Sequence, residues 1–194
     1  MLLNNLRVYL LEEFTRDYSL RLTGSSLAKK KHLNQKSVAN ALREFEEDGF
    51  LKSIPEGRNK VYLLNIQDTK IIENVLSMIE HIKTINFYKK NPVIKEIAEK
   101  ITPFCEGIVL IFGSYAKNTH KEDSDVDILI IGTCKEKKIQ KISEVYNREI
   151  NAKMYPLPVF RKSLHEPVIE EIKKDHIIIL NTEQFVKEML HGED

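Results

Sequence analysis

The stretch GSYAKNTHKEDSDVDILII, residues 113–131, decides the fold of the C-terminal half of this chain. It follows the apolar run GIVLIF, residues 107–112, and ends in a second apolar run, so both flanks are typical of buried strands. Four acidic residues crowd the loop between them, and the last two, Asp125 and Asp127, occupy alternate positions where the second strand begins. Side chains at alternate positions point to the same face of a strand. Two carboxylates held this close repel each other unless positive charge lies between them.

The residues around this loop suit the binding of a nucleoside triphosphate. Gly113 lets the backbone approach phosphate closely, and the hydroxyl of Ser114 at a helix start can hold phosphate oxygens. Lys117, in the next turn, is either a partner of the terminal phosphate or a solvated surface lysine. Asp125 and Asp127 are placed to hold a pair of Mg²⁺ ions, which bridge the nucleotide phosphates and relieve the repulsion between the carboxylates.

The order strand, Gly-Ser, short helix, loop, Asp-x-Asp, strand resembles the minimal nucleotidyltransferases of the polymerase-beta-like superfamily over about residues 91–160. The resemblance implies a small mixed-sheet domain. It also implies that two Mg²⁺ ions bind with a nucleoside triphosphate such as ATP. The implied reaction is transfer of the nucleoside monophosphate to an acceptor hydroxyl.

The family also carries a third metal-binding and catalytic carboxylate on a later strand, here expected in REINAKMY, residues 148–155. The matching position is Asn151, whose carbonyl can bind Mg²⁺ but cannot accept a proton at neutral pH. Glu149 lies two residues earlier on the same face and is the alternative third acid. The catalytic set expected from the sequence is therefore Asp125, Asp127 and Glu149, with Asn151 as a further metal ligand.

The first third of the chain predicts a different module. Apolar residues at helical spacing indicate helices near residues 2–14, 25–32 and 35–48. The β-like segments FLKSI and KVYLLN then flank the turn PEGRN. This order, and the segment LREFEEDGFLKSIPEGRNKVYLLN within it, resembles the winged helix-turn-helix domains of archaeal and bacterial transcriptional regulators over about residues 1–66.

That resemblance implies that the helix at 35–48 enters the major groove of duplex DNA. The segment 1–66 holds 11 Lys and Arg against 8 Asp and Glu, a modest excess of positive charge that suits phosphate contacts. The alternative is that the basic residues form a solvated face and that the module serves protein contacts. The polar and basic residues expected to contact DNA are Gln35, Lys36, Ser37, Asn40, Arg58 and Lys60.

Together these patterns predict an α+β protein with a winged helix-turn-helix domain at residues 1–66, a connecting helix at 67–90 and a nucleotidyltransferase domain at 91–194. The connecting helix carries an apolar stripe at helical spacing. This stripe is expected to pack onto the following domain or to form the seam of a homodimer. Asn91 and Pro92 end the helix and begin the next one.

Composition and patterning exclude several other classes of protein. The chain is 42% apolar and 30% charged, which is typical of a folded protein, and its net charge of +1 favours no class of partner. It has no apolar run of membrane-spanning length and no signal-peptide pattern, so we expect a cytoplasmic protein without membrane contact. Cys105 and Cys134 lack the spacing of zinc ligands and are expected to be buried, reduced thiols.

Two other functions stay open on the sequence alone. The first is a DNA-binding transcriptional regulator whose transferase domain is catalytically idle and senses nucleotide. The asparagine at position 151 favours this regulator, and the intact pair Asp125 and Asp127 disfavours it. The second is an antitoxin-like enzyme that modifies a partner protein, as some minimal nucleotidyltransferases do.

Overall fold

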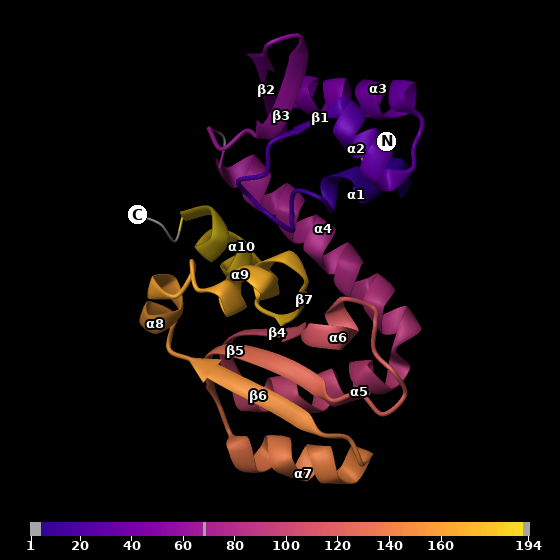
Figure 1. Cartoon of the computed structure of the whole chain (residues 1–194). Coiled ribbons are helices and arrows are strands. Elements are labelled where there is room, and N and C mark those ends of the chain that lie inside the picture. Colours follow the sequence, from indigo (N-terminus) through magenta and orange to yellow (C-terminus); the bar gives the residue numbers. More distant parts are fainter. Residues whose placement is uncertain (1–4, 68, 192–194) are drawn as a thin grey trace. The chain divides into compact units, whose positions relative to one another are not determined.

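The computed structural model describes residues 5–67 and 69–191. They divide into two compact units, Met1–Ile79 and Glu80–Asp194, which Figure 1 colours from indigo to yellow along the chain. The division lies inside α4 (Thr69–Lys90), and the domain boundaries expected at residues 66 and 91 stay a prediction. None of the helices within these described ranges combines the length and the apolar character that crossing a membrane requires.

The N-terminal unit contains helices and one antiparallel sheet. The expected first helix starts among residues outside the described ranges, and the remaining elements follow in the predicted order. The strand order is β1-β3-β2, and β2 and β3 form a hairpin. Its elements are α1 (Asn5–Leu11), β1 (Leu22–Thr23), α2 (Gly24–Lys31), α3 (Gln35–Glu47), β2 (Leu51–Glu56) and β3 (Asn59–Leu64).

Local sequence explains where the two central helices of this unit begin and end. Thr23 forms a capping box with Ser26 at the start of α2. Asn34 caps α3 by accepting hydrogen bonds from the backbone N–H groups of Lys36 and Ser37. After α3, Gly49 adopts a φ of 79°, a left-handed conformation that glycine reaches without steric cost.

The C-terminal unit is a mixed four-stranded sheet with helices on both faces (Figure 1). The strand order is β6-β5-β4-β7, with β5 and β6 parallel and the other pairs antiparallel. The second half of α4 belongs to this unit, together with a short 3-10 turn at Thr102–Phe104. Its other elements are α5 (Pro92–Ile101), β4 (Cys105–Phe112), α6 (Gly113–Ala116), β5 (Val126–Cys134), α7 (Glu136–Tyr146), β6 (Ile150–Tyr155), α8 (Leu157–Lys162), α9 (Pro167–Lys174), β7 (Ile177–Leu180) and α10 (Thr182–His191).

Strand alternation divides the apolar core of this unit into two clusters. Ile111, Ile128 and the residues alternating with them pack against α5 and α7. Ile108 and Leu129, which point the other way, pack against α8, α9 and α10. Because Asp127 alternates with Ile128, its side chain belongs to the face that α8, α9 and α10 cover.

The prediction of reduced cysteines was wrong, because Cys105 and Cys134 form a disulfide. They are direct partners across the antiparallel β4–β5 ladder, with Cα atoms 4.1 Å apart. The pairing depends on strand register, which the separation of 29 residues along the chain does not reveal.

A buried ionic cluster ties α4 to the segment around β7. The carboxylate of Glu80 is fully buried, 3.2 Å from Nε2 of His176 and 2.8 Å from Nζ of Lys83. Nearby, the hydroxyl of Thr84 donates a hydrogen bond of 2.7 Å to the carbonyl of Ile178. Burial by itself would raise the pKa of Glu80, but the charge of Lys83 and the contacts with Lys83 and His176 outweigh it and lower the pKa to about 2.

Candidate active site

The predicted phosphate-binding and metal-binding segments meet at one end of the β4–β5 ladder. Phe112, the last residue of β4, is the Cα partner of Asp127, so Gly113 turns away from the strand directly beside the Asp127 side chain. A Cβ atom on Gly113 would lie only 2.2 Å from Oδ2 of Asp127. Gly113 also has a φ of 69°, so both its space and its backbone conformation require glycine.

Asp125, Asp127 and Asn151 come together across the β5–β6 pair. The parallel register aligns Asp127 with Asn151, and Nδ2 of Asn151 lies 3.4 Å from Oδ2 of Asp125. Asp125 and Asn151 are exposed, and Asp127 is half-buried. Turning the Asn151 amide about its last bond presents its oxygen in place of its nitrogen. Two carboxylates and an amide carbonyl are oxygen donors of the kind that Mg²⁺ prefers, so these residues fit the metal.

Glu149, the alternative third acid, has its backbone held beside the start of β5. It precedes β6 and is exposed, and its backbone carbonyl accepts a hydrogen bond of 2.9 Å from the N–H of Val126. Across the described ranges, no three His, Cys, Asp or Glu side chains form a group that could hold a metal ion. The role of Glu149 in catalysis therefore stays a prediction.

Ser114 and Lys117 lie on and after α6, the single helical turn that follows Gly113. Ser114 is half-buried, and its carbonyl accepts a hydrogen bond of 2.9 Å from the N–H of Thr119. The ammonium of Lys117 forms an ion pair with Glu171 on α9. This hydrogen-bonded pair raises the pKa of Lys117 and lowers the pKa of Glu171.

A cavity of about 110 Å³ lies between α6 and α9 beside this ion pair. Phe112, Val168 and Ile172 give it apolar walls, while Lys117, Glu171 and Asp175 supply the charged ones. Lys117 therefore reaches toward α9, where Glu171 pairs with its ammonium.

Arg148 is the site residue that sequence reasoning missed. It lies in the turn between α7 and β6, and its guanidinium donates hydrogen bonds to backbone carbonyls of the acidic loop at Glu122 and Ser124. The same nitrogen lies 3.2 Å from the hydroxyl of Tyr115 on α6. No sequence pattern indicates these contacts, because they depend on where the loop 117–125 folds.

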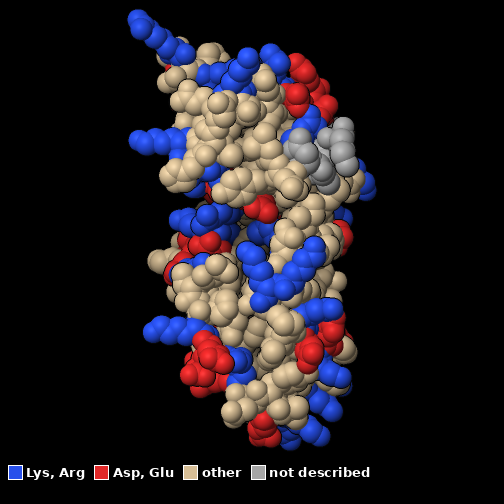
Figure 2. Space-filling view, turned by 90° about the vertical axis from the view of Figure 1, so that its right-hand side faces the viewer, with Lys and Arg blue, Asp and Glu red and all other residues tan. Residues whose placement is uncertain are grey.

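The residues predicted to contact DNA lie at two places in the N-terminal unit. Those at the start of α3 and in the β2–β3 turn are exposed, as are many Lys and Arg side chains in the upper part of Figure 2. Lys60 is different, because Glu46 on α3 binds its ammonium at 2.6 Å and the Tyr62 ring lies below it. The hydrogen bond to Glu46 raises the pKa of Lys60. All of these residues are exposed, Lys60 included; the others are Gln35, Lys36, Ser37, Asn40 and Arg58.

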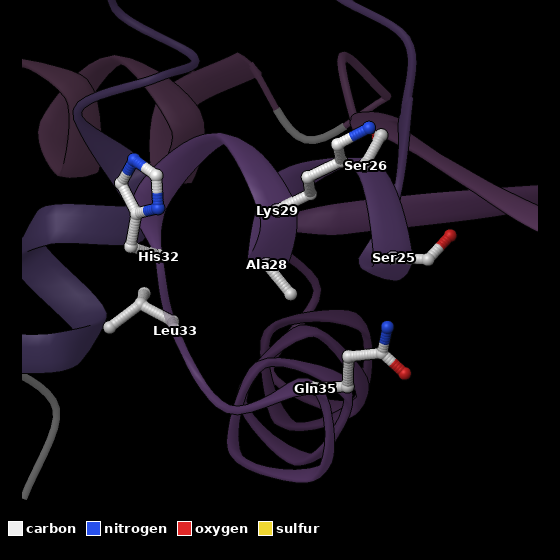
Figure 3. A pocket seen from close by; sticks show the side chains of 7 residues that line it. All are labelled: Ser25, Ser26, Ala28, Lys29, His32, Leu33 and Gln35. Carbon is white, nitrogen blue, oxygen red and sulfur yellow. The ribbon is translucent and has the colours of Figure 1, made fainter.

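An open hollow of about 560 Å³ lies between α2 and the start of α3 (Figure 3). Ser25, Lys29 and Gln35 are among the polar side chains around it, and His32 and Leu33 lie at its other end. Hydroxyl, ammonium and amide groups all donate hydrogen bonds, so this lining suits an anionic ligand.

Comparison with known proteins identifies a family and a relative that part of this chain resembles. Residues 93–191 match the protein family described as "Nucleotidyltransferase domain". The chain is 34% identical over 89 residues to the "Putative protein adenylyltransferase MJ0141" of Methanocaldococcus jannaschii. The match covers 42% of this chain and 89% of that relative.

Two solved structures share weaker likeness. The crystal structure of a toxin-antitoxin with AMP-PNP aligns with a TM-score of 0.36 at 17% identity, covering 52% of this chain and 79% of that one. The archaeal chromatin protein TrmBL2 aligns with a TM-score of 0.28 at 17% identity, covering 88% of this chain and 70% of that one. At these scores neither structure carries an argument about function.

Proposed function

Because the chain belongs to the nucleotidyltransferase-domain family and is a nucleotidyltransferase, we propose that it transfers AMP from ATP to a hydroxyl group of a protein. The observation that carries this proposal is the close approach of Gly113 to Asp127, since it joins a phosphate-binding turn to a metal-binding carboxylate. The name of the relative from Methanocaldococcus jannaschii, a protein adenylyltransferase, supports both the nucleotide and the class of acceptor.

In this proposal each residue has a distinct task. Gly113 leaves room for phosphate, and the hydroxyl of Ser114 donates a hydrogen bond to a phosphate oxygen. Asp125, Asp127 and the carbonyl of Asn151 would hold Mg²⁺. When bound, Mg²⁺ supplies positive charge to the phosphates and to the attacking oxygen. Most of the rate enhancement then comes from positioning and charge, which few residues can provide.

The proton of the acceptor hydroxyl needs a separate destination. Asn151 cannot accept it at neutral pH, because an amide is not a base in that range. We assign proton acceptance to Glu149, the exposed carboxylate two residues before Asn151. The Glu149→Gln variant tests this role, since it should retain nucleotide binding and lose transfer.

The decisive experiment measures which phosphate of labelled ATP becomes attached to a protein. The protein is incubated with Mg²⁺, cell lysate and ATP labelled either at the α-phosphate or at the γ-phosphate. Only the α-label should appear on a protein band, because nucleotidyl transfer releases the β- and γ-phosphates as pyrophosphate. Asp127→Asn should abolish labelling, whereas Asp123→Asn, an exposed acid in the same loop, should retain it.

Three outcomes would contradict the proposal. Labelling from the γ-phosphate would indicate phosphoryl transfer. Labelling that survives Asp127→Asn would remove the proposed metal site. If wild type binds nucleotide with Mg²⁺ yet labels no acceptor, the alternative of an idle, nucleotide-sensing transcriptional regulator is favoured.

We further propose that the N-terminal unit is a winged helix that binds duplex DNA. The exposed start of α3 and the adjoining polar hollow (Figure 3) support this, because phosphates of the DNA backbone could lie against both. Arg58→Ala should weaken binding to all duplex sequences alike and reduce the salt slope of the affinity by about one phosphate contact. A slope that does not change, or no DNA binding at low salt, would assign this unit to protein contacts.

A further inference from the structure

Arg148 contacts both the acidic loop and α6, two segments that must keep fixed positions relative to each other for the proposed site to form. One terminal nitrogen of its guanidinium, Nη1, donates to the carbonyl of Glu122 and, at 3.0 Å, to the carbonyl of Ser124. The hydroxyl of Tyr115 lies 3.2 Å from the same nitrogen. These three acceptors share the two hydrogens of one nitrogen, and the charge of the guanidinium strengthens each bond.

The acceptors lie directly beside the predicted site residues. The Ser124 carbonyl belongs to the peptide bond that leads into Asp125, so holding this carbonyl fixes the backbone from which the Asp125 carboxylate projects. Tyr115 follows Ser114 on α6 and is 5% exposed. A single side chain therefore connects the metal-binding end of the loop to the phosphate-binding turn.

Apart from the ion pair of Lys117 with Glu171 and the 3.4 Å contact between Asp125 and Asn151, the other described contacts of this loop are local. Ser124 bonds twice to Lys121, through its hydroxyl at 2.8 Å and its backbone N–H at 3.1 Å. The ring of His120 stacks on the ring of Tyr115 with centroids 4.2 Å apart. The contacts of Ser124 and His120 fold the loop on itself and onto α6, whereas Arg148 ties it to the turn that precedes β6.

The backbone of Arg148 is itself anchored to the C-terminal end of α7, directly before β6. Its backbone N–H donates to the Ser143 carbonyl at 3.1 Å, and the Ser143 hydroxyl donates to the Arg148 carbonyl at 2.6 Å. The backbone position of Arg148 is therefore fixed, and its side chain binds the acidic loop to that position.

We infer that Arg148 is the positioning residue for Asp125. It holds the loop carbonyls so that Asp125 faces Asp127 and Asn151, and its positive charge offsets the mutual repulsion of the loop acids. Arg148 touches neither nucleotide nor acceptor in this role and acts through Asp125. The inference rests on the proposed metal-dependent nucleotidyl transfer, because only that function requires the two carboxylates to be fixed together.

The first test compares Arg148→Lys with Arg161→Lys in the full-length protein. Lysine retains the charge of Arg148, but its ammonium lies on a flexible stem and lacks the preorganised planar guanidinium that holds the donating nitrogen in place. Arg161 is a matched control in the same unit, because it forms a two-bond ion pair with Glu188, at 2.7 and 2.9 Å, on helices α8 and α10.

Two readouts separate positioning from a general loss of stability. Binding of Mn²⁺ in the presence of a non-hydrolysable ATP analogue is followed by the loss of the free-ion electron paramagnetic resonance signal. The Mg²⁺ concentration that half-saturates AMP transfer is measured in parallel. Arg148→Lys should weaken both by about tenfold or more, since charged hydrogen bonds of this kind are individually strong. Arg161→Lys should leave both unchanged at a comparable melting temperature.

Chemical rescue gives a second, independent test. In Arg148→Ala, millimolar guanidinium ion should restore part of the Mn²⁺ affinity, because it can occupy the vacated position and donate to the same carbonyls. The same concentration of sodium ion or urea should not. A structural defect elsewhere in the unit would not respond to guanidinium in this way.

The outcomes distinguish this inference from the function on which it rests. If Arg148→Lys and Arg148→Ala bind Mn²⁺ and transfer AMP as wild type does, the inference is wrong and the proposed function stands. If wild type binds Mn²⁺ with nucleotide but labels no acceptor, while Arg148→Lys weakens Mn²⁺ binding, the proposed function fails and the positioning role stands. If wild type binds no Mn²⁺ with nucleotide, both are wrong.

Discussion

Gly113→Ala is the substitution that tests the geometry of the site most directly. Residue 113 has a φ of 69°, which costs an alanine about 1–2 kcal/mol relative to glycine. The new methyl group would also lie 2.2 Å from Oδ2 of Asp127, so the carboxylate must move away. Crowding of this kind typically costs about 1–3 kcal/mol. We therefore expect Gly113→Ala to reduce the free energy of unfolding by roughly 2–5 kcal/mol.

A double-mutant cycle with Asp127→Ala separates the two contributions. In the Asp127→Ala background the carboxylate is absent, so Gly113→Ala should cost only the backbone part, about 1–2 kcal/mol. Gly57→Ala is the control for the backbone part, because residue 57 also has a positive φ, 60°. Its new methyl group would meet no atom of the described residues within 4 Å, apart from its chain neighbours. Urea denaturation followed by circular dichroism measures each free energy, analysed separately for each unit if the two unfold in separate transitions.

The same cycle has a functional readout. Mg²⁺ and ATP together should raise the melting temperature of wild type more than either alone, because both bind the native state at one site. Gly113→Ala should lose this joint shift because Asp127 is displaced. If Gly113→Ala costs the same in both backgrounds, or retains the joint shift, the contact between Gly113 and Asp127 does not organise the site.

Two further predictions concern ion pairs of the C-terminal unit. Glu171→Gln releases Lys117 and should strengthen ATP binding about threefold, measured by calorimetry, since water and salt screen an exposed ion pair and leave it a small effect; unchanged affinity would mean that Lys117 does not contact phosphate. The pKa of Glu80 is lowered to about 2. Above pH 4.5 its ionised form therefore stabilises the folded state by about 3 kcal/mol. This stabilisation is lost as the pH falls toward 2. Unfolding measured between pH 5 and 2.5 should show a flatter pH dependence for Glu80→Gln than for wild type, and parallel curves would contradict the assignment.

Much of the site could be predicted because its chemistry is local in sequence. Gly113 and Ser114 follow one strand and Asp125 and Asp127 begin the next, so an antiparallel pairing of those strands suffices to bring them together. The coarse fold class, helices with two sheets, was also predictable from apolar periodicity. Position 151 was expected from the resemblance to the family's third acidic position, and in the structure the parallel pairing of β5 and β6 aligns it with Asp127.

The features that sequence reasoning missed depend on contacts between segments far apart in the chain. The disulfide of Cys105 and Cys134 requires the register of the whole β4–β5 ladder. Arg148 lies 24 residues from Ser124, and neither residue belongs to a motif that indicates the other. Side-chain partners of this kind are set by the packed structure, and propensity and periodicity do not encode them.

The ion pairs of Lys60 and Lys117 affect how strongly these lysines can bind phosphate, and therefore both DNA binding and nucleotide binding. Lys60 was expected to contact DNA, and Lys117 was a candidate partner of the terminal phosphate; a glutamate binds each of them, Glu46 in one unit and Glu171 in the other. An exposed ion pair contributes at most about 1 kcal/mol, because water and salt screen it. A triphosphate or a DNA backbone presents several negative charges at once and gains additional contacts elsewhere in its site, so it can displace a single carboxylate. The glutamates therefore lower the affinity for phosphate by a small factor without preventing its binding. They also keep each lysine paired until a ligand of higher charge arrives, so an isolated phosphate ion should displace neither.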